Sequence, residues 1–231
     1  MLGRIAVFTV AGFAVCVSCL GASPALAACR DGPAPGVDWS ECSKSRKMLA
    51  RENLSGAILS KTDLNGTNLT GANLQGADLS KANLTYATLN GANLSGANMS
   101  FAIGVRTRLT EARMSGAKLH KAEFLRANFA GANLAGADLS SAQLVRGDLR
   151  KADLTNAVLV YANLARADLR DALLEGADLS TAYMLRTRLE GVDLSSAKGL
   201  DARQLEHACG DEKTVLPTGV SRPGAWPCQF E

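Results

Sequence analysis

The stretch 71–95 decides the fold: it reads GANLQ-GADLS-KANLT-YATLN-GANLS, five units of five residues in one frame. The same frame continues without a slip from 51 to 195 and gives 29 units. Its fourth position holds a large apolar residue in 28 units, and its second position holds Ala in 22. A period of five matches neither a strand, with a period of about 2, nor a helix, with about 3.6 residues per turn. The chain must therefore bend once per unit so that every fourth-position side chain points the same way.

A second period, of 20 residues, runs through the first position of the units. One series is glycine, interrupted only by Asn156: Gly56, Gly76, Gly96, Gly116, Gly136 and Gly176. The other is arginine: Arg106, Arg126, Arg146, Arg166 and Arg186. A residue type that recurs every four units indicates four units per coil, with equivalent positions stacked in columns. The glycine column predicts a corner with positive φ, which Gly and Asn adopt most readily.

The frame resembles the pentapeptide-repeat family, whose pattern is A-(D/N)-L-x-x, over 145 of the 231 residues. The resemblance implies an all-β fold: a right-handed quadrilateral parallel β-helix with Leu and Ala pointing inward. The repeat is then a solenoid of about seven coils, roughly 35 Å long at the usual spacing between strands. Gly104 is the one gap in the fourth position, and we expect the Phe124 ring, one coil away, to lean into it.

The segment 1–27 is predicted to be a secretory signal peptide. Arg4 supplies a positive charge, an apolar run spans 5–20, and Ala25-Leu26-Ala27 fits the A-x-A cleavage site. The predicted localisation is therefore periplasmic or extracellular. An alternative stays open, because residues 26–29 also fit a bacterial lipoprotein box that would anchor the chain through a lipid on Cys29.

Four cysteines follow the predicted cleavage site: Cys29, Cys42, Cys209 and Cys228. An even number in an exported chain indicates disulfides, and four cysteines allow three pairings. The predicted rod holds the two flanks about 35 Å apart, far beyond the reach of a disulfide. We therefore expect the local pairs Cys29–Cys42 and Cys209–Cys228.

Both flanks are expected to form small disulfide-stapled caps, because each end of a β-helix exposes unpaired backbone and apolar core. Residues 28–50 are the predicted N-terminal cap, with Trp39 as the plug. A basic run in and beside this cap is expected to be a solvated rim: Lys44, Arg46, Lys47 and Arg51.

Residues 196–231 are the predicted C-terminal cap. Asp201 and Gln204 have the spacing of a capping box, which predicts a short helix directly after Asp201. An extended tail with three prolines follows, and Trp226 is the candidate plug for this end.

The sequence carries no motif for catalysis. Its only two histidines, His120 and His207, lack Cys, Asp or Glu partners at metal-ligand spacing. Nucleophile elbows, phosphate loops and dinucleotide-binding fingerprints are also missing from it. We therefore expect no enzyme activity, no cofactor and no metal site.

The resemblance also implies a possible function as a DNA mimic, because the topoisomerase-binding members of the family resemble DNA in shape and acidity. Residues 51–195 instead contain 16 basic and 14 acidic residues, whereas a DNA mimic needs a strongly negative surface. No nucleic-acid partner is expected either. The sequence favours a non-enzymatic binding or scaffold module of the cell envelope, with an inert structural spacer as the alternative and an exported effector behind both.

The arginine series is the candidate binding strip. An apolar fifth-position residue precedes each arginine: Val105, Leu125, Val145, Ala165 and Leu185. The segments 105–110, 125–130, 145–150, 165–170 and 185–190 together contain nine Arg against Asp148, Asp168 and Glu190, a net charge of +6. Guanidinium groups grip carboxylate and phosphate bidentately, so the expected partner is an anionic envelope component or an acidic protein. In the competing interpretation, Asp148 and Asp168 pair locally with arginine, or repeat duplication copied the residue without selection for binding.

Overall fold

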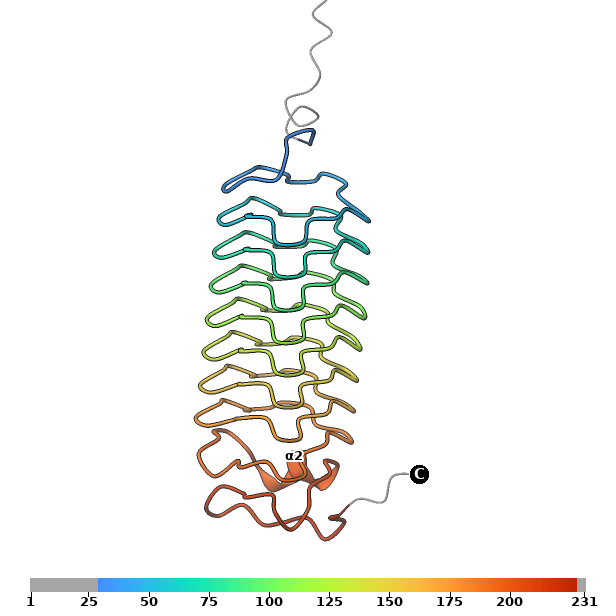
Figure 1. The fold of residues 1–231 in the computed structure, drawn as a ribbon. Coiled ribbons are helices and arrows are strands. Elements are labelled where there is room, and N and C mark those ends of the chain that lie inside the picture. Colours follow the sequence, from blue (N-terminus) through green and yellow to red (C-terminus); the bar gives the residue numbers. More distant parts are fainter. Residues whose placement is uncertain (1–28, 228–231) are drawn as a thin grey trace, which may run out of the picture.

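The computed structural model describes residues 29–227, which form one elongated stack of coils (Figure 1). Parallel bridges join third-position residues 20 apart, from Asp38↔Ile58 to Asp178↔Lys198. Turns occupy the fifth and first positions of each unit, so every coil has four corners. The predicted all-β coil of four pentapeptides is confirmed.

Leucine and alanine fill the interior, as predicted. The large fourth-position side chains from Leu54 to Leu194 are at most 2% exposed. Threonine replaces alanine in the second position at four buried sites: Thr62, Thr67, Thr107 and Thr187. Each of these hydroxyls donates to a carbonyl of the preceding coil, as Thr107 Oγ1 does to Leu84 at 2.8 Å. A polar atom is tolerated in this core because it finds a hydrogen-bond partner.

Asparagine and aspartate in the third position stabilise the turns at the corners through hydrogen bonds of their side chains. The Asn93 Oδ1 atom accepts a hydrogen bond from the Ser95 amide at 3.2 Å. Its Nδ2 group donates to Asn73, one coil earlier, at 3.1 Å. A short side chain with an oxygen can bond to its own backbone two residues on, which favours a turn there. The frame therefore encodes the corner as well as the core.

Positive φ occurs at every first-position residue from Gly36 to Gly191. The prediction for the glycine column is confirmed, but all four corner columns share this conformation. Non-glycine residues accept it too, and the five arginines of the second series have φ between 54° and 60°. The backbone therefore does not explain why arginine occupies one column.

The coil begins before the predicted boundary at 51. Three bridges join the predicted cap segment 28–50 to the next coil: Asp38↔Ile58, Ser43↔Asp63 and Met48↔Asn68. Residues 38–50 therefore extend the β-helix and form no separate cap. They keep the five-residue frame but place Trp39, Lys44 and Leu49 in the fourth position, so the repeat is hard to see in the sequence.

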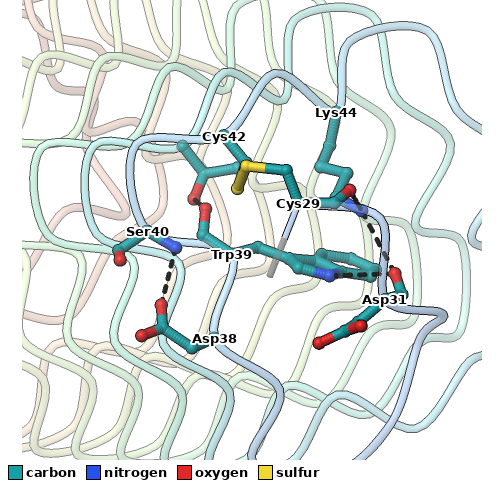
Figure 2. The surroundings of a disulfide bond; sticks show 8 residues. Cys29, Asp31, Asp38, Trp39, Ser40, Cys42 and Lys44 are labelled. Carbon is teal, nitrogen blue, oxygen red and sulfur yellow. Dashed lines mark hydrogen bonds between the residues drawn. A yellow bond between two sulfur atoms is a disulfide. The ribbon is translucent and has the colours of Figure 1, made fainter. Parts of the chain in front are cut away.

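The N-terminal end is closed by a tryptophan, a lysine and a disulfide (Figure 2). Trp39 is 1% exposed, and its Nε1 group donates to the Asp31 carbonyl at 3.2 Å. Lys44 Nζ lies 3.7 Å from the centroid of the Trp39 ring and donates to the Cys29 carbonyl at 2.9 Å. Cys29 is bonded to Cys42, with their Cα atoms 5.5 Å apart. The predicted plug and the predicted Cys29–Cys42 pair are confirmed.

The expectation that Lys44 lies on a solvated rim is wrong. Its side chain takes the leucine position and points into the coil, and the residue is 8% exposed. Burial lowers the pKa of Lys44, with a smaller contribution from the positive charge of Lys47. Arg46, Lys47 and Arg51 are exposed, as expected.

The C-terminal end contains helix α2, Ala202–Glu206 (Figure 1). The Asp201 side chain accepts from the Gln204 amide at 2.9 Å, and the Gln204 side chain accepts from the Asp201 amide at 3.0 Å. The predicted capping box is therefore present. Gln204 Nε2 also donates to the carbonyls of Leu179 and Ala182, which ties α2 to the preceding coil.

The bridge ladder continues past the predicted boundary at 195. Arg188↔Cys209 and Asp193↔Val215 pair across 21 and 22 residues, because the insertion of α2 lengthens the last coil. Trp226 is 8% exposed and donates from Nε1 to the Ala208 carbonyl at 2.7 Å. It closes this end, as predicted.

Two predictions fall outside the described residues. The pair Cys209–Cys228 involves Cys228, and the signal peptide occupies 1–27; both stay predictions. Within 29–227, no helix is long and apolar enough to cross a bilayer.

Candidate functional site

The candidate strip lies along one corner of the stack. We call its five residues the Arg column: Arg106, Arg126, Arg146, Arg166 and Arg186. The amide of each donates to a carbonyl of the next turn of chain, at 2.9 Å from Arg126 to Val145 and at 2.6 Å from Arg186 to His207. All five side chains are exposed. The ladder therefore places one arginine per coil along one edge of the stack.

The apolar residues that precede the arginines line the same edge. Val105, Leu125, Val145 and Leu185 are half-buried, and Ala165 is buried. These side chains are therefore only partly accessible to a partner. The exposed part of the strip is consequently dominated by the guanidinium groups.

The acidic residues of the strip belong to the face that follows the Arg column, which we call the paired face. Arg150 Nη2 lies 2.7 Å from Asp148 Oδ2, and Arg170 Nη2 lies 2.7 Å from Asp168 Oδ2. Arg188 Nη2 lies 3.0 Å from Glu190 Oε1. Contacts of 3.9 Å link Asp168 to the arginines of the coils on either side.

These ion pairs hold two of the carboxylates in the charged form. The hydrogen bond from Arg150 lowers the pKa of Asp148 despite partial burial. Burial raises the pKa of Asp168, but the hydrogen bonds from Arg170 outweigh it and leave the pKa lowered. The local pairing considered from the sequence is real, yet it uses Arg150, Arg170 and Arg188. Within 29–227, no ion pair includes a residue of the Arg column.

The face that precedes the Arg column carries residues that sequence reasoning missed. We call it the aromatic face; it comprises 81–86, 101–106, 121–126, 141–146, 161–166 and 181–186, and the last residue of each segment lies at the corner that carries the Arg column. Its exposed apolar residues are Tyr86 (55%), Phe101 (46%), Ile103 (42%), Tyr161 (66%) and Tyr183 (53%). The same period of 20 could have indicated this face, because Tyr86 and Arg106 are 20 residues apart and occupy the same corner column.

Two basic side chains lie above rings on the aromatic face. Arg106 Cζ is 6.0 Å from the centroid of Tyr86, and Lys121 Nζ is 5.8 Å from that of Phe101. Such contacts attract a cation to the negative face of the ring. The site therefore combines unpaired guanidinium groups with exposed aromatic surface. The described part of the chain holds no group of three or more His, Cys, Asp or Glu that could bind a metal ion.

Comparison with known proteins agrees with the repeat geometry. A family profile described as Pentapeptide repeats matches eight copies, over residues 53–85, 82–120, 122–159 and 162–198. No curated protein sequence matched the chain.

Solved structures of proteins with the same repeat are similar to this chain. One is HetL, a pentapeptide repeat protein involved in heterocyst differentiation regulation from the cyanobacterium Nostoc sp. strain PCC 7120. It is 29% identical, with a TM-score of 0.57 over 79% of this chain and 86% of that chain. Another is trypsin-treated QnrB1, a plasmid-mediated fluoroquinolone resistance protein. It is 20% identical, with a TM-score of 0.50 over 81% of this chain and 93% of that one, a likeness of fold alone.

Proposed function

We infer that this chain, which belongs to the pentapeptide-repeat family, is a non-enzymatic binding module whose Arg column holds an anionic partner. One observation carries the proposal: five exposed guanidinium groups share one corner, and none has a carboxylate partner within 29–227. A guanidinium group offers a planar fork of donors that fits carboxylate and phosphate oxygens. The partner is accordingly an anionic envelope component or an acidic protein.

The stacking of the column gives the partner a physical reason to bind. Neighbouring charges one coil apart, roughly 4.8 Å, repel each other by about 1 kcal/mol in water before salt screens them. An anion placed along the edge removes this repulsion from several pairs at once. The rigid ladder contributes as well, because the arginine Cα positions are fixed before the partner arrives.

The proposed location is the cell envelope, periplasmic or extracellular. Cys29–Cys42 supports an oxidising compartment, where disulfides persist. The same bond argues against lipid attachment at Cys29, because its sulfur is already used. We expect mass spectrometry of the exported protein to find Ala28 as the first residue and Cys29–Cys42 oxidised. A diacylglyceryl group on Cys29 would contradict this.

The Arg column is tested by removing three of its charges. Arg126→Gln, Arg146→Gln and Arg166→Gln together should abolish salt-sensitive retention on a sulfated polysaccharide column. The melting temperature should stay unchanged or rise, because the substitutions remove repulsion and break no ion pair. A matched control is Arg113→Gln, Lys118→Gln and Lys151→Gln, which removes three exposed basic residues from other parts of the surface. Unaltered retention of the first variant would refute the proposal and favour the inert spacer.

A further inference from the structure

We propose that the Arg column binds together with the aromatic face, and that the anionic partner is the phosphate surface of a lipid bilayer on which the rod lies lengthwise. This rests on the proposed anion-binding function and adds two things. It identifies which side of the column meets the partner, and it gives the chemistry of that partner.

The carboxylates distinguish the two faces that flank the column. On the paired face, Asp148, Asp168 and Glu190 would meet an anionic surface, and the arginines beside them are already engaged. Five of the seven basic residues in the six segments of the aromatic face belong to the Arg column itself, so this face adds only Lys81, Lys121 and one carboxylate, Glu123. The paired face also adds a net charge of +1 beyond the column, but it carries three carboxylates. An anionic surface therefore meets less repulsion on the aromatic face.

The exposed rings point to the same face. Every exposed aromatic side chain within 29–227 lies on it: Tyr86, Phe101, Tyr161 and Tyr183. Ile103 also lies on this face, and the remaining exposed large apolar residues are distributed over the rest of the surface: Met48, Ile58, Val158, Leu173 and Val215. Aromatic residues concentrate at the boundary between lipid headgroups and acyl chains, where an apolar ring and a polar edge are both accommodated.

Two of the rings lie beside basic side chains. The cation–ring contacts of Arg106 with Tyr86 and of Lys121 with Phe101 keep the charged heads beside the aromatic surface. Half-buried Leu125 adds aliphatic surface directly beside an arginine. Long basic side chains can then extend to phosphates while the apolar groups contact the acyl boundary. This arrangement suits a rod lying on the membrane surface.

A bilayer fits the spacing of the column better than an extended acidic peptide. A strand presents side chains on one side every 7 Å or so, whereas the coils repeat about every 4.8 Å, so carboxylates and arginines would drift out of register. Lipid headgroups move laterally and adapt to any spacing. Aliphatic Ile103 on the aromatic face also suits acyl chains, while it offers no ring for a sugar to stack on.

Vesicles of phosphatidylcholine, with and without phosphatidylglycerol, test the proposal by co-sedimentation. The full chain is used as the producing cell processes it, so its N-terminal segment contributes equally to every variant. We expect binding only to the vesicles that contain phosphatidylglycerol, with loss of binding at high salt. Each basic residue near an anionic leaflet contributes about five-fold, so the triple Arg→Gln variant should lose on the order of 100-fold in partitioning.

A second variant separates the aromatic face from the Arg column. Phe101→Ser, Tyr161→Ser and Tyr183→Asn use residues that already occur in the same columns, at Ser141 and Asn163. We expect this variant to lose at least about tenfold in vesicle binding, because three rings leave the interface. Its retention on the sulfated polysaccharide column should be unchanged. The matched control, Ile58→Asn, Val158→Asn and Leu173→Asn, should keep both properties.

Each outcome has a defined meaning. Retention on the polysaccharide that depends on the Arg column, without binding to anionic vesicles, overturns the bilayer and leaves the proposed function standing with another polyanion as partner. Equal binding to neutral vesicles also overturns it. Vesicle binding that the control variant reduces as strongly as the aromatic variant overturns the assignment of the face. Independence of both assays from the Arg column refutes the proposed function itself.

Discussion

Gly104→Leu should destabilise the protein by about 3 kcal/mol, although it restores the leucine that the repeat has in this position almost everywhere else. A Cβ atom on Gly104 would collide with the ring of Phe124, one coil later, because the ring fills the space above the glycine. Phe124 is 0% exposed and packs against Phe129, with ring centroids 5.5 Å apart. The ring therefore has no free space to move into.

A second substitution, at Phe124, makes the prediction specific. Phe124→Leu alone should destabilise by leaving a cavity, whereas Gly104→Leu combined with Phe124→Leu recreates two ordinary units. We expect the double variant to unfold in urea close to the wild-type midpoint, so that the two substitutions compensate each other. Coupling between contacting residues amounts to roughly 0.5–3 kcal/mol. A Gly104→Leu protein as stable as wild type would show that the ring can leave the gap.

The sequence predicted the regular part of this fold because each unit specifies its own geometry. The fourth-position leucine, the second-position alanine and the third-position Asn or Asp act within five residues or on the adjacent coil. A strict frame then sets the stacking of distant residues without further information. Even the packing of the Phe124 ring into the gap at Gly104 was predicted from the period of 20, because the two residues occupy the same column one coil apart.

The ends could not be predicted in the same way. Lys44 occupies a leucine position because its ammonium group reaches the Cys29 carbonyl, a contact that depends on how the chain folds back over the open coil. At the other end, α2 lengthens the last coil, so that Asp193 pairs with Val215. Both features arise from tertiary contacts that no repeat position encodes.

The candidate site was predicted in part. The period of 20 placed the Arg column on one corner, but the paired face depends on which arginine turns toward each carboxylate. Asp168 forms its short ion pair with Arg170, two residues away, and forms none with a member of the Arg column. The aromatic face escaped notice because Tyr86 and Tyr183 occupy different positions of the repeat in different coils, and only the coil brings them onto one side.

Trp39→Ala should remove about 4 kcal/mol from the N-terminal end of the rod. The side chain is 1% exposed, and its loss opens a cavity that the first coil cannot fill. Lys44 would also lose the ring beneath its ammonium group, which lies 3.7 Å from the centroid. Trp39→Phe is the control, because it retains a ring for Lys44 and most of the buried volume, and it should cost less than half as much.

The solenoid architecture determines which coils the loss of stability in Trp39→Ala affects. Each coil contacts only its neighbours, so destabilisation at one end should open the coils nearest to it and leave distant coils closed. In Trp39→Ala we expect faster amide hydrogen exchange at Leu59, whose bonded carbonyl belongs to Asp78, than at Leu134, whose partner is Asp153. The Cys29–Cys42 bond should limit the opening, since it keeps the chain ends of this segment together. Uniformly faster exchange along the whole rod would show that the stack unfolds as one cooperative unit, and that the plug stabilises every coil equally.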